Sequence, residues 1–258
     1  MKARIWLLFS GIFLVVAYLL GLPDGKMRVV FCDVGQGDAI LATKGYNQLL
    51  IDTGPDNKKV LGCLERYMPF WDKKLEIVII SHEDKDHWGG YADVEKNYKI
   101  EKLGYGISDK GLFEQKMYAE EVRRNDVIRL GEILFEVINP SDNLVEKQND
   151  NDGSVAGVLH YKDNRFLLTG DVSKEVEQLW VWRGYLSGQI DVLKVSHHGS
   201  DESTGEELLA AIKVREAVIS VGRNSFGHPR KEVLDRLEIR GVKVRRTDKE
   251  GDVVYVID

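Results

Sequence analysis

The 258-residue chain has only two cysteines and lacks both a low-complexity linker and a convincing internal repeat. The absence of linkers and repeats argues against a string of modules, and the composition fits one large domain with an ample core. The cysteines, Cys32 and Cys63, do not settle the cellular compartment. They could pair in an oxidising space, but unpaired buried cysteines are as common, and we expect the unpaired state.

Excess positive charge is also missing, since the formal net charge is −6. An acidic domain gains little non-specific affinity for nucleic acid from its overall field. The charge is nevertheless uneven, because residues 190–246 hold 11 basic and 9 acidic side chains. Those expected near the ends of strands are Arg223, Arg230, Lys231, Arg245 and Arg246.

Long apolar runs are confined to the amino terminus. Lys2 and Arg4 precede a charge-free stretch from residue 5 to residue 23, whose length is at the lower limit for crossing a bilayer. No clean small-x-small cleavage site follows, so we favour an uncleaved signal anchor over a cleaved signal peptide for residues 1–24. The basic flank should stay in the cytoplasm, which would place residues 25–258 outside it, tethered to the membrane or secreted after cleavage.

The remaining chain alternates between strand and helix patterns. We expect strands at 27–34, 39–43, 48–52, 75–80, 127–138, 154–162, 165–169, 190–196, 216–221, 242–246 and 252–257. We expect helices at 57–68, 90–97, 173–187, 205–213 and 229–240. The early strands form a meander and the later ones alternate with helices, which suits a four-layer αββα sandwich preceded by one hydrophobic helix.

Residues 81–90 are the densest group of chemically active side chains. They follow the apolar strand at 75–80 and hold His82, Asp84, Asp86 and His87 within six positions. Such density has no ordinary packing explanation, whereas a cluster of this kind can divide its ligands between two neighbouring ions. The cluster therefore indicates a metal-dependent hydrolase.

Other candidate ligands also follow apolar strands. The chain has six histidines, of which His197 and His198 end one strand and His228 lies between a strand and a helix. Asp171 and Asp52 end two further strands; Asp52 taken alone is more typical of a turn or cap. The remaining histidine, His160, lies within a strand, where a structural role is more common. Strand ends gathered at one edge of a sandwich would form the rim of an active site.

Several short motifs occur together in one order along residues 27–252. They are residues 31–39 (Phe-Cys-Asp-Val-Gly-Gln-Gly-Asp-Ala), 51–54 (Ile-Asp-Thr-Gly), 81–90, 151–154 (Asn-Asp-Gly-Ser), 168–171 (Leu-Thr-Gly-Asp), 194–200, 222–229 and 246–248. This ordered set resembles the metallo-β-lactamase superfamily and, more narrowly, the extracytoplasmic hydrolase domain of ComEC-type DNA-uptake proteins.

The resemblance implies a pair of divalent metal ions. His82 and Asp84 would hold the first ion, Asp86, His87 and His198 the second, and Asp171 would bridge them. The usual third histidine of the first site is absent, and Ser154 or Asp152 would complete that site. His197 would point to the opposite face of its strand and support the ligands from behind. The extra carboxylate at Asp84 makes manganese as plausible as zinc.

The resemblance also implies a mechanism in which a hydroxide between the two ions attacks a phosphodiester. Asp86 and His228 are the candidate catalytic residues, with His228 contacting a phosphate oxygen or protonating the leaving oxygen. Asn224 and Ser200 would make polar contacts with the substrate. Three residues of the Gly-Gln-Gly turn region would line or support the site, namely Asp33, Gln36 and Asp38. Asp52 would orient a metal ligand from behind.

The predicted substrate is DNA, single-stranded or double-stranded, or another phosphodiester. ComEC-type proteins carry a multi-helix channel, whereas this chain has one apolar segment, so a separate membrane channel protein is the implied partner. One alternative is a surface phosphoesterase resembling phosphorylcholine esterases, or another ester hydrolase. The other is a domain that binds DNA or a cell-wall polymer without cutting it, which the missing histidine would favour.

Overall fold

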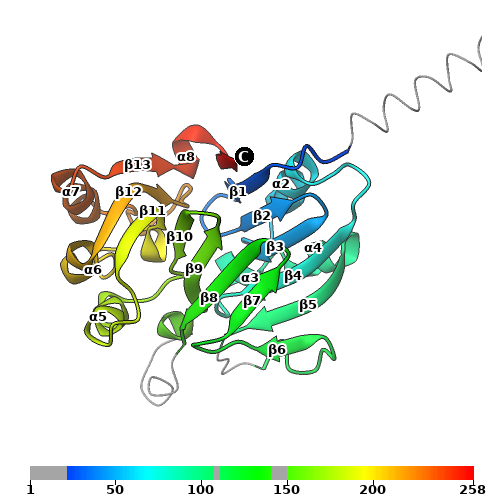
Figure 1. The fold of residues 1–258 in the computed structure, drawn as a ribbon, viewed down its shortest axis with the longest axis horizontal. Helices are drawn as coiled ribbons and strands as arrows, with labels where there is room; N and C mark the ends of the chain where they lie inside the picture. The colour runs from blue at the N-terminus through cyan, green and yellow to red at the C-terminus, as the bar shows by residue number, and fades with distance from the viewer. Residues whose placement is uncertain (1–21, 107–110, 141–149) are drawn as a thin grey trace, which may run out of the picture.

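The computed structural model describes residues 22–106, 111–140 and 150–258, and its centre is a pair of β-sheets packed face to face (Figure 1). Each sheet has seven strands, and helices cover the two outer faces. The expected αββα sandwich is therefore confirmed for this part of the chain. The predicted amino-terminal helix lies in residues 1–21, outside the described residues, and no helix among the described residues has the length and apolar character needed to cross a membrane.

The first sheet has the order β14-β1-β2-β3-β4-β5-β6. Its strands are β1 (Met27–Phe31), β2 (Ile40–Lys44), β3 (Asn47–Ile51), β4 (Lys74–Ile80), β5 (Lys99–Tyr105), β6 (Ala119–Glu121) and β14 (Val253–Ile257). The pairs that join β14, β1, β2 and β3 are antiparallel, whereas β3, β4, β5 and β6 run parallel. The carboxyl ends of β3 and β4 consequently lie at the same edge.

The second sheet has the order β13-β12-β11-β10-β9-β8-β7. Its strands are β7 (Val127–Leu130), β8 (Ile133–Asn139), β9 (Ala156–Tyr161), β10 (Asn164–Leu168), β11 (Gly188–Lys194), β12 (Ile212–Ile219) and β13 (Lys243–Arg246). Here β10, β11, β12 and β13 are parallel, so the chain leaves β10 and β11 at one edge as well.

The connecting helices are short. They are α2 (Lys59–Tyr67), α3 (Lys85–Trp88), α4 (Tyr91–Asn97), α5 (Lys174–Trp182), α6 (Glu206–Ala211), α7 (Lys231–Ile239) and α8 (Thr247–Glu250), with 3₁₀ turns η1 (Asp150–Gly153) and η2 (Ser196–Gly199). Buried side chains of α2 and α4 pack on the first sheet, and those of α5, α6 and α7 pack on the second.

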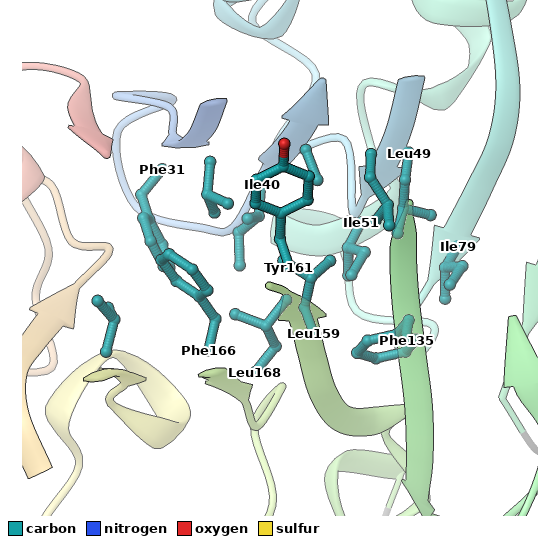
Figure 2. Packing of buried hydrophobic residues seen from close by; sticks show 14 of the residues in the cluster. Phe31, Ile40, Leu49, Ile51, Ile79, Phe135, Leu159, Tyr161, Phe166 and Leu168 are labelled. Carbon is teal, nitrogen blue, oxygen red and sulfur yellow. The ribbon is translucent and has the colours of Figure 1, made fainter. Parts of the chain in front are cut away.

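The main core lies between the sheets. Figure 2 shows side chains from β1 to β4, such as Phe31 and Leu49, facing side chains from β8 to β10, such as Phe135 and Phe166. Alternate residues of a strand point to opposite faces, so in β1 Phe31 enters this core while Val30 packs on the helical side. This packing fixes the strands whose ends carry the candidate site.

Several expectations about the elements differ from the structure. The single strand at 127–138 is instead the hairpin of β7 and β8. The strands β5 and β6 were not expected, because their exposed positions hold charged residues and no continuous apolar run marks them. The strand at 190–196 ends early, at Lys194, before the histidine pair.

The expectation of unpaired cysteines was wrong. Cys32, just after β1, and Cys63, in α2, form a disulfide with 5.9 Å between their Cα atoms. The two sulfur atoms meet because α2 packs directly on the face of the sheet from which the Cys32 side chain projects. Disulfides persist chiefly in oxidising compartments, so the pair bears on where the domain works.

Candidate metal centre

The predicted ligands converge at the edge where strands of both sheets end. His82 follows β4, His87 lies in α3, Asp171 follows β10, and His198 lies in η2 after β11. A backbone hydrogen bond of 2.8 Å, from Val155 N to Ser81 O, joins the two sheets beside these residues. Ligands commonly bind outside the carboxyl ends of parallel strands, and the geometry here follows that rule.

Three imidazole nitrogens point into this edge without hydrogen-bond partners among the described residues. They are the buried Nε2 atoms of His82, His87 and His198. The Oδ2 atom of Asp171 lies 3.3 Å from Nε2 of His87 and 3.3 Å from Nε2 of His198. Buried polar atoms that lack partners are costly, and a bound cation would satisfy them together. The residues present therefore fit a metal ion.

The orientation of His87 is set from behind by Asp52. Oδ2 of Asp52 lies 2.7 Å from Nδ1 of His87, and the same carboxylate accepts hydrogen bonds from the backbone N and the hydroxyl of Ser81. A carboxylate on one ring nitrogen holds the proton there and leaves the other nitrogen free for a metal. Asp52 thus lies where it can support a ligand, as the sequence suggested.

His198 is oriented by a different device. Its Nδ1 donates to the backbone oxygen of Ser220 at 2.8 Å, which directs Nε2 toward Asp171 and Asp86. Both His197 and His198 have left-handed backbone conformations, with φ of 48° and 52°. The expectation that His197 faces away across a continuing strand is wrong, because the strand has already ended. Its ring lies instead 5.7 Å from the ring of His228.

The two other acidic residues of the cluster lie at different depths. Oδ2 of Asp86 is 3.3 Å from Nε2 of His198, and Oδ2 of Asp84 is 3.7 Å from Nε2 of His82. Burial raises the pKa of Asp86, but the close contact with His198 and the charge of His87 outweigh it and lower that pKa to about 2. Asp84 is more exposed, at 46 % of its side chain. Asp86 is therefore the carboxylate held more firmly against the histidines.

The ligands fall into overlapping groups whose donor atoms lie close enough to share an ion. One group joins His82, His87 and Asp171; a second joins Asp86, His87 and His198; a third joins Asp38, Asp171 and His198. Asp171, His87 and His198 each belong to more than one group. These overlapping groups could hold a metal ion, and together they offer enough ligands for two.

Lys194 is a central residue that the sequence reasoning did not assign. Its side chain is wholly buried, and Nζ lies 2.5 Å from Asp38 Oδ2, 3.1 Å from Asp171 Oδ1 and 2.7 Å from the backbone oxygen of Gly170. Burial lowers its pKa, but the two carboxylates outweigh that effect and raise it. Because Lys194 occupies Oδ1, Asp171 presents Oδ2 to the histidines. The sequence feature that could have identified this residue is a charged lysine within the apolar run that precedes the histidine pair.

Ser154 and Asp152, the candidates to replace the missing third histidine, both lie behind the ligands. Ser154 Oγ is 3.3 Å from Nδ1 of His82, on the far side of that ring from Nε2, and donates to Asn151 O at 2.6 Å. Oδ1 of Asp152 accepts a hydrogen bond from Ser173 N. These contacts position the loop that follows η1.

The Gly35–Gly37 turn packs directly against the ligand cluster. A Cβ on Gly37 would lie 2.2 Å from Asp86 O, so only glycine allows this approach. Asp38 follows the turn and is buried, with Oδ1 lacking a hydrogen-bond partner among the described residues. Gln36 accepts a hydrogen bond from Gly222 N. Asp33 instead turns toward Lys59, at 3.4 Å, away from the histidines.

The remaining candidates, Asn224, His228 and Ser200, belong to none of the ligand groups. Nδ2 of Asn224 donates to the backbone oxygens of Gly222 and His228. His228 is half-buried; burial and then the neighbouring charge of His197 lower its pKa, so the neutral imidazole is favoured. Oγ of Ser200 accepts a hydrogen bond from Glu202 N.

Comparison with known proteins identifies the family of this chain. Residues 32–223 match the metallo-beta-lactamase superfamily model. The chain belongs to the metallo-beta-lactamase superfamily. Membership agrees with the two sheets, the outer helices and the histidine-aspartate groups at their edge, and it makes the domain a metallo-hydrolase fold.

Within the superfamily, the chain is similar to proteins of competence. It is 30 % identical to ComE operon protein 3 of Bacillus subtilis over 94 % of this chain and 34 % of that protein. It is 33 % identical to Recombination protein 2 of Haemophilus influenzae, over 86 % of this chain and 28 % of that protein. The chain therefore spans about a third of the length of these relatives, and the ComEC-type resemblance is confirmed for this part.

Solved structures share the fold at lower identity. The metallo-beta-lactamase fold protein YhfI of Bacillus subtilis aligns with a TM-score of 0.62 and 14 % identity, covering 90 % of this chain and all of that one. At this identity the likeness describes the arrangement of sheets and helices. It does not extend to the reaction.

Proposed function

We propose that this protein is a metal-dependent phosphodiesterase that cleaves DNA, acting outside the cytoplasmic membrane in a DNA-uptake setting. The observation that carries the proposal is a set of three imidazole nitrogens without hydrogen-bond partners among the described residues, those of His82, His87 and His198, beside Asp171. Oδ2 of Asp171 lies 3.3 Å from the nitrogens of His87 and His198. This set of ligands suits a pair of divalent ions, zinc or manganese.

The substrate class is inferred from the relatives. Their names assign them to competence and recombination, processes that handle DNA. Two features of this chain agree with an external location: the apolar stretch at residues 5–23 behind a basic flank, and the Cys32–Cys63 disulfide. A separate membrane channel protein is the partner that this setting requires. A protease-accessibility assay on intact cells tests the location, and protection of the domain would contradict it.

The residues of the chain have distinct tasks in the proposed reaction. Bound divalent ions would polarise the phosphodiester and lower the pKa of a coordinated water. His82, His87, His198, Asp86 and Asp171 would hold the ions. Asp52 keeps the proton of His87 on Nδ1, so that Nε2 stays free to bind, and Lys194 fixes Asp171 with Oδ2 directed inward.

His228 has the task of contacting the substrate. Its neutral imidazole carries one N–H that can donate a hydrogen bond to a phosphate oxygen, and its Nδ1 has no hydrogen-bond partner among the described residues. Asn224 holds the backbone of His228 in place, because its Nδ2 donates to His228 O and its Oδ1 accepts from His228 N. The ring therefore needs little reorganisation to meet a phosphate beside the histidine cluster.

The test is DNA cleavage by the purified full chain with each metal. We expect cleavage that requires Mn²⁺ or Zn²⁺ and is lost in Asp171→Asn, a substitution that keeps the shape but removes the charge. His160→Gln is the matched control, because His160 pairs with Glu136 on the strands β8 and β9, outside the ligand groups. Cleavage of small phosphodiesters but not of DNA would favour a surface phosphoesterase. Metal binding without cleavage of either substrate would overturn the proposal.

A further inference from the structure

The loop of residues 222–230 is fixed in place beside the metal centre. Gly222 packs on the Gly35–Gln36 backbone so closely that a Cβ would lie 2.4 Å from the carbonyl carbon of Gly35. At the other end, Arg230 N donates to Gly199 O at 2.8 Å, one residue after His198. Both anchors belong to segments that carry or contact the ligands, so the loop keeps a set position relative to them.

Asn224 makes this loop rigid internally. Its Nδ2 donates to the oxygens of Gly222 and His228, both at 2.9 Å, and its Oδ1 accepts from His228 N at 3.0 Å. One side chain thereby closes a ring of hydrogen bonds around residues 225–227. The tip of the loop is consequently held in one conformation before any ligand arrives.

Phe226 lies at this tip and is 61 % exposed. Its ring centroid is 5.8 Å from that of His228 with an interplanar angle of 31°, and the ring of His228 is 5.7 Å from that of His197. Since the ring of His197 is in turn 6.4 Å from that of His198, a line of rings leads outward from the ligand His198 to an apolar ring in solvent. The exposed cations Arg223 and Arg230 flank the same loop.

We propose that Phe226 is a stacking platform for an unpaired nucleobase of the DNA strand whose phosphodiester lies in the metal centre. This inference rests on the proposed function and names its preferred substrate as single-stranded DNA. A base in a duplex is already paired and stacked on its neighbours, so an exposed ring selects a strand whose bases are free. The nearby arginines supply charge to the backbone of that strand, which the acidic domain as a whole does not.

Isolated exposed aromatic residues are common on proteins and need no ligand. Phe226 differs from them because it lies on a loop anchored at both ends, beside the ring of His228 and near two exposed arginines. A phosphorylcholine substrate, which the alternative surface phosphoesterase would cleave, has a choline group that proteins hold in a cage of several aromatic rings. The ring next to Phe226 among the described residues is that of a histidine, which favours a flat base.

The first test compares substrate kinetics of Phe226→Ala with those of the wild-type full chain. Loss of one base–aromatic stack should raise KM for single-stranded DNA about 5- to 100-fold and leave kcat largely unchanged, since the contact exists before and during the reaction. Phe226→Trp should restore the wild-type KM. Phe70→Ala is the matched control, because Phe70 is 82 % exposed but precedes β4, whose opposite end leads to the site.

The second test removes the base instead of the ring. A series of single-stranded oligonucleotides, each with one abasic position at a different place, should contain one member for which the wild-type KM rises. For that oligonucleotide, Phe226→Ala should have the same KM as the wild type. A 2-aminopurine at that position should be quenched on binding to the wild type and not to Phe226→Ala. If the wild type cleaves DNA but no abasic position depends on Phe226, the stacking platform is wrong while the nuclease stands. If the wild type cleaves no DNA, the proposed function itself has failed.

Discussion

Replacement of Lys194 by methionine tests the electrostatic design of the centre. Methionine matches the length of lysine but removes the ammonium that lies 2.5 Å from Asp38 and 3.1 Å from Asp171. The two carboxylates would then share a buried site without a cation of their own. Removing one partner from a buried ionic group destabilises proteins by about 3–5 kcal/mol. We expect a loss of that size in the free energy of unfolding of the metal-free protein.

The assay is urea unfolding in the presence of a chelator, followed by tryptophan fluorescence. The midpoint should fall while the slope of the free energy with urea is unchanged, because the fold buries the same surface. Addition of Mn²⁺ or Zn²⁺ should recover part of the loss, since a divalent ion replaces the missing positive charge near Asp171 and binds only the folded state.

The control is Lys231→Met, which removes an exposed lysine paired with Asp235 on the surface of α7. Exposed ion pairs contribute little, so this variant should unfold like the wild type. If Lys194→Met is as stable as the control without metal, the idea that its ammonium balances the buried carboxylates is refuted.

Three further predictions concern a supporting residue, a buried acid and the disulfide. Asp52→Asn is tolerated by the left-handed backbone at this position, but its amide N–H would face Nδ1 of His87 and move the ring proton to Nε2. Metal affinity, measured by calorimetry, should therefore fall about 10- to 100-fold. An unchanged affinity would argue against the role of Asp52. Burial disfavours the charged carboxylate of Glu177 more than its backbone N–H donors favour it, and raises the pKa from 4.5 to about 7. Between these pH values the folded state binds a proton that the unfolded state has lost, so the free energy of unfolding falls as the pH rises through them. Glu177→Gln should remove about 3 kcal/mol of this fall in urea titrations at several pH values; an equal slope in both proteins would contradict it. Reduction of Cys32–Cys63, which closes a separation of 31 residues, should lower the melting temperature, and an unchanged value would show that the crosslink does not constrain the unfolded chain.

Much of the site was predictable because its chemistry lies at strand ends. Apolar runs before His82, Asp171 and His198 mark buried strands, and polar residues directly after them must lie at a sheet edge. The partners of those residues were harder to foresee. That Asp52 meets Nδ1 of His87 depends on β3 and β4 being parallel neighbours, which periodicity does not encode.

The features that the sequence did not predict also depend on contacts between elements far apart in the chain. Lys194 lies in an apolar strand and would be costly there alone; its carboxylate partners come from other elements, so its place follows only from the folded arrangement. The Cys32–Cys63 disulfide depends on α2 packing over β1, a tertiary contact. The hairpin of β7 and β8 was read as one strand because both halves are apolar.

Metal content and DNA cleavage measured on one preparation of the full chain test the proposed chemistry most directly. We predict that elemental mass spectrometry will find two divalent ions per chain. DNA cleavage should disappear with a chelator and return with Mn²⁺ or Zn²⁺. Asp171→Asn should lose both bound metal and cleavage. A wild-type protein that folds but holds no ion, or that holds two ions and leaves every phosphodiester intact, would contradict the proposal.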